Sequence, residues 1–219
     1  MKHIKLTTLI FGLLLFGCNQ ADNKRTSVTE EKATTSANDT EQIQNLIRQV
    51  LNWADTKKSI DLLPVLADSR DSLYIGFDLD KHKQNLDKFQ KTNFFATEFI
   101  ENYNQIILNL DKGLRNGNNE QWLVGDLPTF NFSSGVNPWT LSQDIPYDHP
   151  NPFDFVEIKL LKIDKGELIW KWGKPELITE PSWKDFEYKF RVVKENDRWK
   201  ISYLQGFDFK ESTCYGRQL

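Results

Sequence analysis

Apolar residues recur at helical spacing in the first half of the chain and at alternate positions in the second half. One amphipathic stripe predicts a helix that opens at Asp39 or Thr40 and ends near Lys57 and Lys58. A second stripe predicts the longest helix, which starts at Thr92 and stops at the glycine-containing segment 113–117. Shorter patterns between them predict a helical turn over 62–66, a strand over 72–76 and a polar helix over 81–89.

The second half predicts two β-hairpins, with turns over 164–166 and 195–197. The expected inward positions are Val156, Ile158, Leu160, Leu168, Trp170, Trp172, Phe186, Tyr188, Phe190, Val192, Trp199, Ile201 and Tyr203. The positions between them are mostly charged, so each strand has one polar and one apolar face. We therefore expect an α+β fold, in which helices from the first half pack on a curved antiparallel sheet of about four or more strands from the second half.

The start of the chain has a separate pattern, with a basic segment holding Lys2 and Lys5, an apolar stretch over 6–17, and then Cys18. The apolar stretch is too short to span a bilayer as a stable helix. Its end, Leu15-Phe16-Gly17-Cys18, resembles the lipobox of bacterial lipoprotein precursors. That resemblance implies a signal peptide over 1–17, cleavage before Cys18, and diacylglycerol attached to the sulfur of Cys18.

Two other interpretations of this segment are an ordinary secretory signal with an incidental cysteine and a cytosolic protein with an apolar first strand. The basic start, the apolar length and the Gly-Cys end together favour the lipoprotein. Its lipid chains would hold it on a membrane, at about 0.8 kcal/mol per buried methylene. Asn19 replaces the aspartate that resembles an inner-membrane retention signal, so we expect a cell-envelope protein of the outer membrane.

Composition divides the rest of the chain into a tether, a domain and a tail. Residues 18–38 are polar and predict a disordered tether with a reach of roughly 25 Å. Residues 39–209 hold all seven tryptophans and have the length of one domain. In the polar tail, 210–219, Cys214 has no partner for a disulfide if Cys18 is acylated.

The charge of the chain argues against nucleic acid as a partner. Loss of 1–17 removes two lysines and no acid, so the net charge of −3 becomes −5 for the mature chain. A protein that binds nucleic acid needs a basic surface to neutralise the phosphates, and a net negative charge makes such a surface less expected.

Two segments resemble a known class of domain. The last hairpin, 188–201, reads Tyr-Lys-Phe-Arg-Val-Val-Lys-Glu-Asn-Asp-Arg-Trp-Lys-Ile and resembles the nuclear-transport-factor-2-like domains. Residues 137–144 resemble a stretch of an uncharacterised family of exported bacterial proteins of that class, in which Asp-Pro is followed after several residues by Gln-Asp, with Asn137 in place of the first Asp. The resemblance implies a cone-shaped α+β domain with a pocket between the sheet and the long helix. Members include enzymes, ligand binders and interaction modules, so it leaves the function open.

Segment 126–154 contains five prolines and has no clear periodicity, which is typical of a loop that is functional or partly disordered. Asp144, Asp148, His149 and Asp154 within it could hold a hard cation or provide an acid/base pair. Aspartates before proline-rich turns more commonly cap local backbone N–H groups. The chain has no motif of a known hydrolase, phosphate loop or zinc site, so we expect no metal, no cofactor and no catalytic set.

Most aromatic side chains of such a domain fill its core. Trp122 and Trp139 lie in or beside the irregular segment, so we expect them to be exceptions that contact a ligand. The sequence thus favours a membrane-anchored, non-enzymatic module that binds a small ligand or a protein partner. The alternatives are an enzyme that uses Asp144 or Asp148 with His149, and an immunity-type inhibitor of a periplasmic toxin.

Overall fold

The computed structural model describes residues 37–56, 60–70, 72–117, 122–125, 137–141, 155–171 and 185–208. All of them belong to one compact unit, Ala33–Leu219. The expected signal peptide, Cys18, most of the expected tether and the polar tail lie outside the described residues. Among the helices that are described, none is both long and apolar enough to cross a membrane.

The three helices of the first half are α1 (Ala37–Thr56), α2 (Leu79–Thr92) and α3 (Thr97–Arg115). Helix α1 buries the expected apolar stripe, which includes Ile43 and Ile47. Helix α2 begins after Asp78, whose side chain accepts a hydrogen bond from the N–H of Lys81 at 2.9 Å. It ends at Asn93, whose left-handed backbone terminates the helix.

The expectation that the longest helix starts at Thr92 is wrong, because the helix in question, α3, starts five residues later, at Thr97, and is one residue shorter than α1. The intervening backbone pairs with the last strand of the sheet. Ile201 donates from its N–H to the carbonyl of Phe94 at 2.9 Å, and the N–H of Ala96 donates to the carbonyl of Ile201 at 2.8 Å. This pairing takes Phe95 out of the helical stripe and buries its ring beside the sheet.

A small antiparallel sheet joins β1 (Val65–Ala67) to β2 (Tyr74–Phe77). The helical turn expected over 62–66 is therefore wrong, whereas the strand expected over 72–76 is confirmed with shifted ends. β-branched Val65 pairs opposite Phe77, so cross-strand packing decides against the helix.

Helix α3 holds β2 through an ion pair that also binds the backbone of Phe77. Asp111 accepts hydrogen bonds from the N–H of Phe77 at 2.7 Å and from Nε of Arg115 at 2.8 Å, and Nη2 of Arg115 donates to the carbonyl of Phe77 at 3.2 Å. A Cβ on Gly76 would lie 2.9 Å from Asp111 Oδ1, so only glycine leaves room for this contact.

The second half forms a four-stranded antiparallel sheet, as expected, in the order β3 (Phe155–Leu161), β4 (Lys165–Lys171), β5 (Tyr188–Glu195) and β6 (Arg198–Leu204). The β5–β6 turn is two residues long, and Asn196 and Asp197 both have positive φ, at 52° and 59°. The fold is thus α+β, with helices in the first half and the main sheet in the second. A short 3₁₀ turn, η2 (Gln205–Phe207), follows β6.

Two β-bulges change which side chains face the core. The extra residue Lys159 lies between the pairs Ile158–Leu168 and Leu160–Glu167, so Leu160 turns outward and Leu161 turns inward. Ser202 has the same effect in β6, where Tyr203 faces away from the core, beneath the guanidinium of Arg191. The inward positions expected for Leu160 and Tyr203 are therefore wrong.

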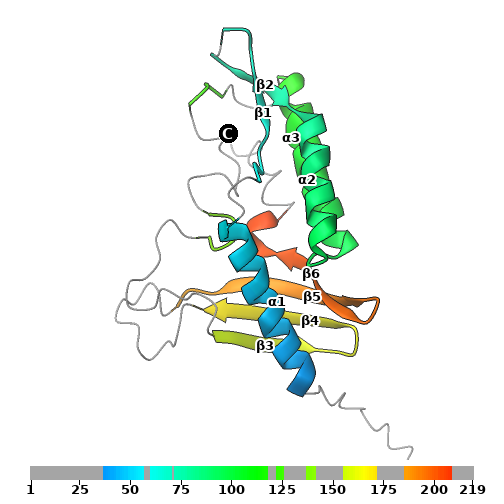
Figure 1. Cartoon of the computed structure of the whole chain (residues 1–219). Helices are drawn as coiled ribbons and strands as arrows, with labels where there is room; N and C mark the ends of the chain where they lie inside the picture. The colour runs from blue at the N-terminus through cyan, green and yellow to red at the C-terminus, as the bar shows by residue number, and fades with distance from the viewer. Residues whose placement is uncertain are drawn as a thin grey trace, which may run out of the picture. The chain divides into compact units, whose positions relative to one another are not determined.

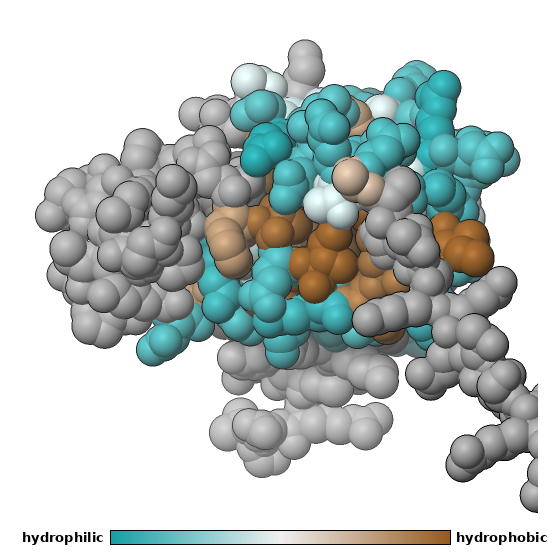
Figure 2. Space-filling view, turned by 90° about the horizontal axis from the view of Figure 1, so that it is seen from below, coloured by the Kyte–Doolittle hydropathy of each residue, from teal (hydrophilic) through white to brown (hydrophobic). Residues whose placement is uncertain are grey.

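Helix α1 lies across one face of the four strands, while α2 and α3 lie side by side (Figure 1). Both α1 and α3 contact β6. The edge strand β3 and the turn after it leave Phe155, Leu160 and Ile163 exposed, and apolar side chains gather among polar ones on the face seen from that side (Figure 2). The main core lies between the helices and the face of the sheet that α1 covers.

Candidate functional site

Aromatic side chains fill the interior between α1, α2 and the segment that leads into α3. Trp139 lies at the centre of this group, with ring centroids 4.8 Å from Phe207, 5.8 Å from Trp53 and 6.0 Å from Phe95. Phe89 joins the group from α2, with its ring centroid 5.0 Å from that of Phe95. These rings pack against one another in the described part of the core, and the pocket expected between the sheet and the long helix stays a prediction.

A short turn over 137–141 holds Trp139 in place. The side chain of Asn137 accepts a hydrogen bond from the N–H of Trp139 at 2.9 Å. The hydroxyl of Tyr188 donates to the carbonyl of Pro138 at 2.9 Å and accepts from the N–H of Gly206 at 3.1 Å. A Cβ on Gly206 would lie 1.9 Å from that carbonyl oxygen, so the close approach requires glycine.

Trp122 and Trp139 are thus part of the core and are not exceptions to it. Their exposed fractions are 6% and 9%. The backbone of Trp122 also extends the small sheet, because its carbonyl accepts from the N–H of Tyr74 at 2.9 Å. Neither side chain presents a wide face to solvent.

Asp144, Asp148 and His149 lie outside the described residues, as do Cys18 and Asp154. The possibility of an acid/base pair or a cation site in that segment stays a prediction. Within the ranges that the structure describes, no group of three or more His, Cys, Asp or Glu side chains is placed to hold a metal ion.

An open pocket of about 360 Å³ lies where α1, the α2–α3 junction and the start of β6 meet. We call it the junction pocket. Polar and apolar atoms share its surface about equally, and the lining residues are Gln42, Asn45, Leu46, Gln49, Thr92, Asn93, Phe94, Arg198 and Trp199. Sequence reasoning missed this site because it combines three segments far apart in the chain. The spacing of Gln42, Asn45 and Gln49, which places three carboxamides on one face of α1, is the signal that could have indicated it.

The floor of the junction pocket is fixed by hydrogen bonds. Asp39, near the start of α1, accepts from Nε1 of Trp199 at 2.7 Å and from Nζ of Lys194 at 3.2 Å. The hydroxyl of Thr92 is also committed, because it donates to the carbonyl of Phe89 at 2.7 Å. The contacts of Asp39 join α1 to the β5–β6 hairpin, whereas the contact of Thr92 lies within α2.

The remaining polar side chains of the lining are not committed in this way. The carboxamides of Gln42, Asn45, Gln49 and Asn93 form no hydrogen bond with the described part of the chain. The guanidinium of Arg198 forms neither a hydrogen bond nor an ion pair with that part. Four carboxamides and one cation are therefore available to solvent or to a ligand.

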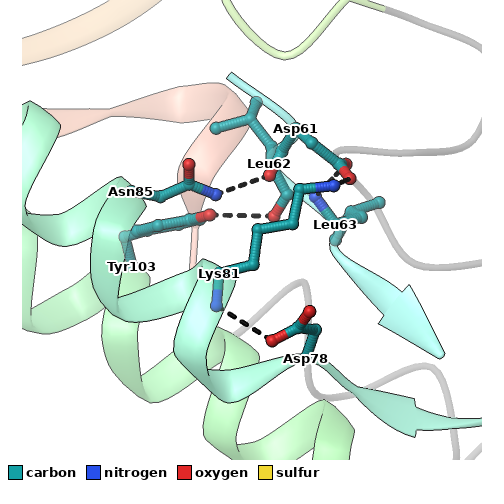
Figure 3. A network of polar contacts seen from close by, with 7 residues as sticks. All are labelled: Asp61, Leu62, Leu63, Asp78, Lys81, Asn85 and Tyr103. Carbon is teal, nitrogen blue, oxygen red and sulfur yellow. Dashed lines mark hydrogen bonds and ion pairs between the residues drawn. The ribbon is translucent and has the colours of Figure 1, made fainter. Parts of the chain in front are cut away.

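A second polar cluster lies on α2 and α3, and Figure 3 shows it from close by. Asp61 accepts from the N–H of Leu63 and pairs with Lys81 at 2.8 Å, while its carbonyl accepts from Asn85 at 2.6 Å. The hydroxyl of Tyr103 donates to the carbonyl of Leu62 at 2.9 Å. Lys81 and Asn85 of α2 and Tyr103 of α3 all bind segment 61–63, so the cluster holds this segment against the two helices.

Two pKa shifts fit this structural role. The hydrogen bond and charge of Asp61 raise the pKa of Lys81, which keeps the ammonium charged. Burial raises the pKa of Tyr103 far above its usual value, so its hydroxyl keeps its proton near neutral pH. Neither group is placed to act as a base.

His82 lies one turn into α2 and is buried, with an exposed fraction of 3%. Its Nε2 lies 2.9 Å from Oδ1 of Asn104, and since that oxygen can only accept, Nε2 carries the proton. Nδ1 has no hydrogen-bond partner in the described part of the chain. Burial lowers the pKa of His82, because an imidazolium here would lose its hydration.

Comparison with protein-family models, curated proteins and solved structures finds no significant match to this chain.

We expect His82 to make the domain less stable in acid. Its pKa is below 6.5 in the folded state, so the unfolded state binds the extra proton first, and stability decreases as the pH falls below about 6.5. His82→Gln should make the free energy of unfolding depend less on pH between about 7 and 5, as measured by urea denaturation. The other histidines are present in both proteins, so equal pH dependence would contradict the assignment.

Proposed function

We propose that this chain is a lipid-anchored, non-enzymatic binding module of the cell envelope, and that the junction pocket is its binding site. The observation that carries the proposal is a set of polar side chains on rigid elements that lack partners in the described part of the chain. These groups lose no internal hydrogen bond when they bind a ligand, and the helix and strand that carry them fix their backbone, although ordering each side chain costs about 0.5–1.5 kcal/mol.

The chemistry of the lining favours binding over catalysis. Carboxamides neither gain nor lose protons in the physiological pH range, and a guanidinium stays charged throughout it. They can hold a ligand by donating and accepting hydrogen bonds, but they cannot act as a general base. An Asp or His that reached the pocket from another part of the chain would be needed for acid/base chemistry.

The anchor is part of the same proposal. The basic start, the apolar stretch and Cys18 support acylation of the cysteine and retention at a membrane, with the outer membrane favoured by Asn19. A polar tether would then let the pocket sample a zone of roughly 25 Å from the lipid. The helices-then-sheet order of the domain is compatible with membership of the nuclear-transport-factor-2-like class.

Replacing Cys18 with serine should abolish lipid attachment and release the chain from membranes. The measurement is mass spectrometry of the chain purified from its native cells, together with its distribution between membrane and soluble fractions. Cys214→Ser is the matched control, since Cys214 is the only other cysteine, and it should keep the lipid. A chain without lipid on Cys18 would refute the anchor.

A large side chain placed in the junction pocket should prevent a ligand from binding there. We expect native mass spectrometry of the chain from its native cells to show a bound species that Gln49→Trp loses. Gln105→Trp adds the same ring to an exposed position of α3 and should retain the species. Loss from both variants, or from neither, would count against the junction pocket as the binding site.

A further inference from the structure

Among the described residues that line the junction pocket, one side chain is charged, the guanidinium of Arg198, and none is acidic. Arg198 is the first residue of β6, directly after the two-residue turn. The next residue, Trp199, is 5% exposed and bonded to Asp39. The backbone that carries the cation is thus held by both the turn and the core.

Glu195, opposite Arg198 in the register of β5, and Asp39, on α1, already have partners, and Asp197, which precedes Arg198 in the turn, forms no ion pair with it. Glu195 pairs opposite Arg198 in the strand register, but its Oε1 accepts from the N–H of Thr97 at 3.2 Å and its Oε2 pairs with Lys200 at 3.2 Å. Asp39 is occupied by Trp199 and Lys194. Within the described residues the positive charge of Arg198 is therefore not neutralised by an ion pair.

The shape and charge of this group select a class of ligand. A guanidinium presents a planar fork of N–H donors that matches the two oxygens of a carboxylate. A single positive charge also balances a monoanion, whereas a phosphate dianion would leave excess negative charge. The carboxamides beside it can donate to the remaining lone pairs and accept from N–H or O–H groups of the same ligand.

We propose that the junction pocket binds a ligand bearing a carboxylate, with Arg198 paired to the carboxylate and Gln42, Asn45 and Gln49 hydrogen-bonded to the atoms next to it. This inference rests on the proposed function and specifies the chemistry of its site. Because the pocket is open, the carboxylate can belong to a small organic acid or to the C-terminus of a polypeptide.

Three probes separate these sources. Acetate presents a carboxylate alone, N-acetyl-diglycine presents it at the end of a peptide, and N-acetyl-diglycinamide presents the peptide without it. Binding to the full chain in detergent micelles can be followed by NMR, through the side-chain signals of Arg198 and of the three carboxamides. We expect N-acetyl-diglycine to bind about tenfold more tightly than its amide.

The variant Arg198→Gln should abolish this preference for the acid. The matched control Arg70→Gln removes a cation whose side chain is 85% exposed in another turn, and it should leave the preference intact. Acetate binding as tightly as N-acetyl-diglycine would identify a small acid, and weaker acetate binding would identify a polypeptide terminus. Equal binding of acid and amide, no binding of either acid up to ~10 mM, or an unchanged preference in Arg198→Gln would overturn the inference.

Failure of the carboxylate inference can be distinguished from failure of the proposed binding function. If the acids fail to bind but Gln49→Trp still removes a species carried from native cells, the pocket binds a ligand of another chemistry. If that variant also changes nothing, the binding function itself fails.

Discussion

The packing of Trp139 is the interaction on which the rest of the domain depends. Its indole contacts rings from α1, from the segment before α3 and from the 3₁₀ turn after β6. The turn that delivers it is fastened to the sheet by the hydroxyl of Tyr188. Elements far apart in the sequence are thereby joined through one side chain, and the interior between them is filled. The junction pocket, where we propose that a ligand binds, lies at the surface of the described part of the domain.

The polar groups of the domain follow a division that supports this conclusion. Those that are buried or half-buried, such as Asp111, Asn85 and Asp39, bind backbone or partner side chains and so stabilise the fold. The carboxamides on α1 and the guanidinium of Arg198 do not stabilise it through such contacts. These side chains contribute little to folding yet gather around one hollow, which is why we propose a binding role for them.

The sequence predicted those parts of the fold whose signals are local. The stripe of α1 and the alternation of the hairpins identified the α+β class, because periodicity reflects the face that each element buries. The start of α3 was misplaced because the backbone of Phe94 and Ala96 pairs with Ile201, more than a hundred residues away. Single-residue bulges at Lys159 and Ser202 turn Leu160 and Tyr203 away from the core, and no residue pattern in the sequence indicates either bulge. The junction pocket could not be predicted from a local pattern, because three segments far apart in the sequence form its lining. The expected site residues Asp144, Asp148 and His149 lie outside the described residues.

The most direct measurement for the filled interior is the free energy of unfolding of Trp139→Ala, determined by urea denaturation. We expect a loss of about 3–5 kcal/mol, because the substitution leaves a cavity among packed rings. Phe155→Ala removes a ring that is 37% exposed on the edge strand and should cost far less. A change within about 0.5 kcal/mol of the unmodified chain for Trp139→Ala would contradict the central role of this side chain and reopen the interior as a place for a ligand.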